Sequence, residues 1–199
     1  MRYEKARDFI IKKLTEELDP DLSYHNIDHT LDVLQAASNL ASLEGIDEHN
    51  RLLLETAALF HDSGMLKTYQ GHEQASAELV RQYLPDFGYQ AEEVDTICNM
   101  IITTQLPQRA DNFLEKILCD ADLDYLGRED FFMVAHKLKY EWNILNIKHT
   151  TLREWYELQI IFLENHEFFT ASAKKLRNEK KADNLQQVRE LVYFMREQE

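Results

Sequence analysis

The chain has 199 residues, 44% of them hydrophobic, and so is long enough to bury a core as one domain spanning residues 1–199. Its formal net charge of −14 argues against non-specific nucleic-acid binding, which depends on positive charge. Its 2 cysteines exclude a disulfide framework, and no apolar run is long enough to span a membrane. The first residues carry charges of both signs and no signal-peptide core, so we expect a cytoplasmic protein.

Apolar residues recur at helical spacing along the whole chain, and no window alternates as a half-buried strand does. Asp47 is expected to cap one of the resulting helices. Helices are predicted over residues 3–18, 48–62, 71–85, 90–104, 111–125, 129–146, 150–165 and 170–198, and another leads from the segment 24–29 to about residue 43. The predicted fold class is all-α, a bundle of about eight or nine helices with mostly short loops.

The segment from Leu52 to Phe60 is apolar almost all the way round a helix, so we expect it inside the domain. His61 and Asp62 follow it directly. A buried imidazole beside a buried carboxylate is costly unless something satisfies both groups, and a metal ion uses both at once. Gly64 then offers a left-handed position that commonly ends a helix.

Several other histidines and aspartates stand at or near the ends of apolar helices. The full set of candidates is His25, His29, His61, Asp62, His72, Asp120, Asp122 and Asp124. His25 and His29 share a helix face if the helix already includes residue 25. A minimal ligand set takes one residue or pair from each of three helices, namely His29, His61, Asp62 and Asp122. Imidazole nitrogen and carboxylate oxygen suit a divalent ion, which can be Mn, Fe, Co, Ni, Mg or Zn.

Each candidate also has a plainer interpretation. A single histidine on an apolar helix is more often a hydrogen-bonded core residue than a metal ligand. The run from Asp120 to Asp124 alone would suit an exposed acidic turn, and His72 would equally suit the start of a surface helix. The occurrence of these motifs together, in this order, favours the metal site.

Three segments in this order resemble the HD-domain superfamily of metal-dependent phosphohydrolases. They are Tyr24-His25-Asn26-x-x-His29, His61-Asp62 and Ala121-Asp122-Leu123. The first is also similar to a segment of the cyclic-nucleotide phosphodiesterases. In size and layout the chain resembles small bacterial proteins described as predicted HD-superfamily phosphohydrolases, over roughly residues 22–145.

The resemblance implies an HD-domain-like helical bundle with a central metal site, on which the helices of residues 146–199 pack. It implies that His29, His61, Asp62 and Asp122 hold the metal, with Asp120 and Asp124 outside the ligand set. It also implies that His25 protonates the leaving oxygen.

The chain departs in three places from the better-known families that it resembles. The glutamine and aromatic clamp of the phosphodiesterases are not recognisable. The acidic pair that follows the HD motif in alarmone hydrolases is replaced by Met65, Leu66 and Lys67. Thr103-Thr104-Gln105 stands where two-metal families place a further histidine. We therefore expect one metal ion, or a second one held mainly by Asp62 and water.

The expected function is hydrolysis of a phosphoester by metal-activated water, and the expected substrate is a nucleotide. Asp62 is expected to orient or deprotonate this water. His25 is the expected general acid. His72 and Lys67 are candidates for substrate binding, and His72 could instead serve as the acid or hold a second ion. Weaker candidates, for phosphate or for a base pocket, are Arg109, Lys139, Tyr24, Tyr69 and Trp142.

Two other functions stay open at this point. The protein could be a metal-containing module that binds or senses a nucleotide without turning it over. It could also be a helical scaffold whose charged tail, residues 170–198, docks a partner, although a tail packed on its own domain is the simpler account. A homodimer is compatible with the sequence.

Overall fold

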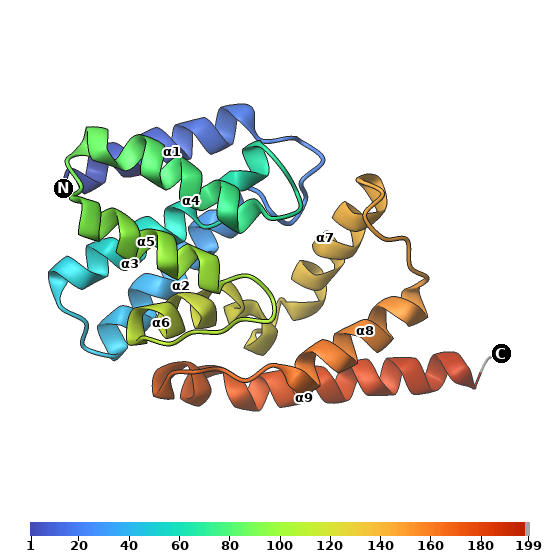
Figure 1. The fold of residues 1–199 in the computed structure, drawn as a ribbon. Helices are drawn as coiled ribbons and strands as arrows, with labels where there is room; N and C mark the ends of the chain where they lie inside the picture. The colour runs from blue at the N-terminus through green and yellow to red at the C-terminus, as the bar shows by residue number, and fades with distance from the viewer. Residues whose placement is uncertain (198–199) are drawn as a thin grey trace. The chain divides into compact units, whose positions relative to one another are not determined.

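The computed structural model describes residues 1–197, and within them all regular secondary structure is helical (Figure 1). Nine α-helices and three short 3-10 helices follow one another along this part of the chain. Their bounds are α1 Tyr3–Glu17, α2 Ile27–Leu43, α3 Glu48–Phe60, η1 Ser63–Leu66, α4 His72–Tyr83, η2 Leu84–Phe87, α5 Ala91–Thr103, α6 Phe113–Asp122, η3 Asp124–Gly127, α7 Phe131–Ile144, α8 Leu152–Asn165 and α9 Ala171–Arg196. The all-α prediction is confirmed.

The contacts of the chain form two compact units, Met1–Asp122 and Leu123–Glu199. The first unit holds α1 to α6 and contains all four predicted metal ligands. The second holds η3 and α7 to α9. The organisation of residues 1–199 as one domain stays a prediction.

Helix α3 is the central helix of the first unit, since it contacts α1, α2, α4, α5 and α6 (Figure 1). Every residue from Leu53 to Phe60 is buried. A helix that meets neighbours on all its faces needs apolar side chains all round, as the sequence of this segment predicts. The chain therefore leaves α3 inside the unit, and His61 and Asp62 are buried there as well.

Side-chain caps fix where two of the helices begin. The Asn26 side chain accepts a hydrogen bond from the His29 amide at 3.2 Å and caps α2. Helix α2 therefore starts at Ile27, so His25 precedes the helix and does not share a helical face with His29. Asp47 caps α3, as predicted, because its Oδ1 accepts a hydrogen bond from the Asn50 amide at 3.1 Å.

Gly64 serves a different purpose from the one predicted. It lies in η1 and is not among the glycines with positive φ, so the prediction of a left-handed helix end was wrong. Its amide donates a hydrogen bond to Ser76 Oγ at 2.7 Å. A Cβ at this position would overlap the His72 carbonyl and lie 2.7 Å from the Ser76 nitrogen. The lack of a side chain thus lets α4 approach the turn that follows α3.

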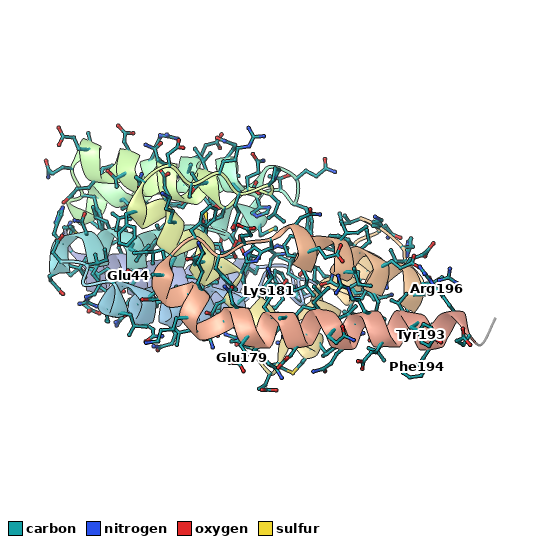
Figure 2. All side chains as sticks on the ribbon, turned by 90° about the horizontal axis from the view of Figure 1, so that it is seen from below. Glu44, Glu179, Lys181, Tyr193, Phe194 and Arg196 are labelled. Atoms are coloured by element: carbon teal, nitrogen blue, oxygen red, sulfur yellow. The ribbon has the colours of Figure 1, made fainter. Side chains whose placement is uncertain are left out.

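In the second unit, α8 packs along α9, and η3 packs against α9 as well. The predicted tail helix over residues 170–198 is α9, whose predicted end at residue 198 lies outside the described residues. Figure 2 shows Tyr193 and Phe194 on the last turns of α9, where both side chains are exposed. Among the described residues, no helix combines the length and the apolarity needed to cross a membrane.

Candidate metal centre

The turn after α3 presents two buried polar side chains to one point. His61 is the C-cap of α3, and its Nδ1 lies 2.8 Å from the Ala58 carbonyl oxygen. Because only a protonated Nδ1 can donate to that carbonyl, the ring is held with Nε2 facing away from its own helix. Asp62 follows immediately and shares the site with Nε2 of His61, which lies 3.1 Å from Asp62 Oδ2.

Two other helices complete the cluster. His29 comes from the first turn of α2, and its Nε2 lies 3.3 Å from Nε2 of His61. Asp122 is the last residue of α6, and its Oδ1 lies 3.4 Å from His29 Nε2 and 3.6 Å from His61 Nε2. His29 Nε2 is also 3.4 Å from Asp62 Oδ2.

These spacings match those between ligands of a single ion. Ligand atoms at about 2.0–2.2 Å from a divalent ion lie roughly 3–3.5 Å from one another in tetrahedral or octahedral geometry. The ligand atoms of His29, His61 and Asp122 all lie within 4.8 Å of one another, and Asp62 Oδ2 adjoins both histidines. Asp62 Oδ2 is buried. Its contacts with His29 and His61 lack hydrogen-bond geometry, so this oxygen accepts no hydrogen bond. A cation would satisfy this oxygen.

The electrostatics of the cluster follow from its two carboxylates. Burial disfavours a charge on His29, but Asp122 and Asp62 outweigh burial and raise its pKa to about 10. Burial likewise opposes the charge on His61, and Asp62 above all raises its pKa. The pKa of Asp62 is lowered well below its usual value although burial opposes this, because three histidines surround the carboxylate. Without a metal, the cluster therefore attracts positive charge in the form of protons.

His72 joins the site through the second oxygen of Asp62. It is the first residue of α4, and its Nε2 lies 3.3 Å from Asp62 Oδ1. Its Nδ1 lies 2.9 Å from the Tyr69 carbonyl oxygen, which orients the ring. Burial opposes a charge on His72, but Asp62 raises its pKa to about 9. The buried Glu73 carboxylate is 3.8 Å from the same Nε2, and the sequence pattern did not single out this residue.

Aromatic rings surround the cluster on the side of His25. The His25 ring centroid lies 5.4 Å from that of His72, 5.5 Å from that of Tyr69 and 6.3 Å from that of His29. Tyr24 is buried and packs on the His29 ring with 4.6 Å between centroids. Tyr24 thus helps to orient His29, while the half-buried Tyr69 faces His25.

Other residues proposed from the sequence have neighbours of their own. Lys67 is 44% exposed, and its ammonium lies 3.4 Å from a Glu78 carboxylate oxygen. Its role in substrate binding stays a prediction. In the second unit, Arg177 donates two hydrogen bonds to Asp124, at 2.7 and 2.9 Å, and Lys139 donates one to the Thr150 carbonyl at 2.9 Å.

Further candidates are found in the core or at the surface. Asp120 is fully buried in α6, which excludes the exposed acidic turn as an account of this residue. Trp142 packs edge-on against Trp155, with 5.4 Å between ring centroids. Arg109 is exposed in the segment before α6. The roles of Arg109 in phosphate binding and of Trp142 in a base pocket stay predictions.

Gln108 was not among the residues proposed from the sequence. It lies between α5 and α6, and its Nε2 donates a hydrogen bond to Asp122 Oδ2 at 3.3 Å. The local sequence carries no signal for this contact, because it depends on how the segment folds back over the end of α6.

In a comparison with known protein families, residues 26–124 match the family model of the HD domain. Over 102 residues the chain is 30% identical to an uncharacterized protein of Clostridium beijerinckii. This match covers 50% of the present chain and 64% of that relative, which is less than two thirds of its length.

Solved structures share the fold over nearly the whole chain. A predicted HD superfamily hydrolase from an uncultured Thermotogales bacterium has 24% identity and a TM-score of 0.58, covering 98% of this chain and 92% of its own. YpgQ of Bacillus subtilis, in complex with ADP, has 20% identity and a TM-score of 0.67, covering 95% of each chain. Lin1889 of Listeria innocua has 21% identity and a TM-score of 0.65, covering 96% of each chain. At such identities the likeness shows a shared fold.

Proposed function

The chain belongs to the HD-domain family, and we propose that it is a divalent-metal-dependent phosphohydrolase acting on a phosphoester, foremost that of a nucleotide. The observation that carries the proposal is the convergence of His29, His61, Asp62 and Asp122 from three helical segments, with spacings of 3.1–3.6 Å where their ligand atoms adjoin. In a purely structural ion-pair network, the buried carboxylate oxygens would be hydrogen-bonded, whereas Asp62 Oδ2 accepts no hydrogen bond.

These four residues would hold the ion, since two imidazoles and two carboxylates form a donor set that suits several first-row divalent metals and magnesium. When bound, such an ion lowers the pKa of a coordinated water and offsets negative charge on a phosphoryl group.

Asp62, His25 and His72 have separate roles in the proposed reaction. Asp62 directs Oδ2 to the ligand cluster and Oδ1 to His72, so it can both hold the ion and orient a nearby polar group. His25 lies against His72 and Tyr69 beside the cluster, where its imidazole can pass a proton to a leaving oxygen. In this proposal, His72 contacts a phosphoryl oxygen of the substrate.

The nucleotide part of the proposal rests on two supports. YpgQ, which shares the fold, has been crystallised in complex with ADP. In the present chain, the half-buried Tyr69 ring next to His25 offers an aromatic surface within reach of the cluster.

The test measures metal content and hydrolysis together. The purified protein would be analysed for bound metal and then assayed on nucleoside mono-, di- and triphosphates and cyclic nucleotides with Mn²⁺, Mg²⁺, Co²⁺ or Ni²⁺. We expect metal binding and hydrolysis of at least one nucleotide, measured as release of phosphate or pyrophosphate or, for a cyclic nucleotide, as formation of the nucleoside monophosphate. Metal and nucleotide binding without any turnover would favour a sensing module, and an absence of metal binding would overturn the proposed site.

A further inference from the structure

We infer that Gln108 is a positioning residue that holds the Asp122 carboxylate in the orientation needed to bind the metal. The inference rests on the proposed metal site. Gln108 Nε2 lies 3.3 Å from Asp122 Oδ2, whereas Oδ1 of the same carboxylate faces His29 at 3.4 Å and His61 at 3.6 Å. Because a carboxylate can only accept, the amide must present its NH₂ group to Asp122.

Asp122 needs such a partner more than the other three proposed ligands do. Its side chain is 15% exposed, compared with 7% for His29, 8% for Asp62 and 1% for His61. It is also the last residue of α6, where the helix no longer continues to restrain it. Asp62 is enclosed by three histidines, and His61 is fixed by the Ala58 carbonyl.

Within residues 1–197, Gln108 supplies the hydrogen-bond donor found on Asp122 Oδ2. The same Nε2 lies 3.5 Å from the Cys119 carbonyl, one of the last four carbonyls of α6 that the helix itself cannot satisfy. A single amide group therefore bridges the backbone of the last turn and the carboxylate at its end. This bridge opposes rotation of Oδ1 away from the histidines.

The segment that carries Gln108 is held at both ends. On one side, Cys119 Sγ donates to the Thr103 carbonyl at 3.3 Å, which ties α5 to α6. On the other side, the amides of Asp111 and Asn112 donate to Glu115 Oε2 at 2.8 and 3.2 Å. Gln108 is thus presented by a short, anchored connection, as an outer residue that orients a metal ligand must be.

The experiment compares metal affinity in Gln108→Met with that in Gln105→Met. Methionine keeps the length of the side chain and removes the donor, while the exposed Gln105 in the same connection provides the matched control. Dissociation constants for Mn²⁺ would be measured by calorimetry on chelator-treated protein. We expect Gln108→Met to bind Mn²⁺ at least about 10-fold more weakly, the usual cost of losing an outer-shell partner, and Gln105→Met to match the wild type.

Thermal melting of the metal-free proteins separates positioning from general stability. A positioning role predicts weaker metal binding with an unchanged melting temperature in the metal-free state. If Gln108→Met melts lower, Gln108→Asn decides by the same calorimetry, since its shorter side chain withdraws the amide from Asp122. Wild-type affinity in the Gln108 variants would overturn the inference, whereas a wild-type protein that binds no metal would overturn the proposed function instead.

Discussion

Asp62 Oδ1 lies 3.3 Å from Nε2 of His72, on the opposite side of the carboxylate from the metal-ligand cluster. One buried aspartate therefore connects the proposed ligands to the first residue of α4. The contact depends on Gly64, which lets the start of α4 approach the turn after α3. This relationship explains why His72 belongs with the site although it lies outside the minimal ligand set.

Replacing Asp62 by asparagine should abolish stable metal binding. The change keeps the shape of the side chain but removes the charge that His29 and His61 face. We expect at least about a 100-fold loss of metal affinity, more than the loss of a single outer-shell partner would cause. Elemental analysis of the purified protein would check it, with Asp28→Asn on the exposed face of α2 as the control. Equal metal in Asp62→Asn and wild type would contradict the ligand set.

Replacing His25 by glutamine should lower turnover and leave metal content unchanged. His25 lies beside the cluster without being one of its ligands, and general acids typically contribute about 10²–10⁴-fold to a rate. The measurement is kcat on the best nucleotide found in the screen, together with metal content. His49→Gln, at an exposed position on α3, should have no effect on either. An active His25→Gln enzyme would remove His25 from the mechanism.

The metal-free protein should lose stability as the pH rises above neutrality. The folded-state pKa of His29 is raised to about 10 and that of His72 to about 9, both from 6.5. A raised pKa contributes stability that is complete below the unfolded value near 6.5 and disappears as the pH rises through the folded value. The melting temperature of chelator-treated protein should therefore fall between about pH 6.5 and pH 10.

Two comparisons test whether the histidine–aspartate cluster causes this fall of the melting temperature with pH. Metal requires deprotonated ligands, so the melting temperature of metal-loaded protein should exceed that of chelated protein by a margin that grows with pH. Asp62→Asn removes a carboxylate next to His29, His61 and His72 and should flatten the slope in the chelated state. If the melting temperature of the chelated wild-type protein did not change between about pH 6.5 and pH 10, this would contradict the raised pKa values of His29 and His72.

Gly64→Ala should destabilise the protein by about 3 kcal/mol or more, because the added Cβ would overlap backbone atoms of α4. Gly45→Ala is the matched control. Gly45 has φ +70° and open space around its Cβ position, so alanine there should cost only about 1–2 kcal/mol of backbone strain. Urea unfolding of the two variants gives both values. Equal losses would mean that the close approach of α4 carries no special cost.

Neither cysteine should react with a thiol reagent in the folded protein. Burial raises the pKa of the Cys98 thiol and raises that of Cys119 to about 12, so little thiolate forms at pH 8. Ellman's reagent should label both thiols within minutes in denaturant, where the thiol pKa returns to about 8.5. Rapid labelling of one thiol in the native protein would show that the α5–α6 region opens.

The sequence by itself determined which segments are helical and which of them is central. Helical spacing predicted each of the nine helices within a few residues, because amphipathic faces and breakers such as Pro85 act locally. The all-round apolarity of Leu52–Phe60 predicted the buried helix α3, and the order of the three motifs indicated the candidate ligands.

The tertiary structure alone decided the contacts that join distant segments. Asn26 caps α2 and leaves His25 outside the helix, whereas periodicity alone allowed an earlier start. Gly64 is needed for its missing Cβ and not for a left-handed turn, a distinction that depends on where α4 packs. Gln108 meets Asp122 because the connection between α5 and α6 folds back over the end of α6. Such contacts depend on three-dimensional packing of residues far apart in the chain, which local spacing does not encode.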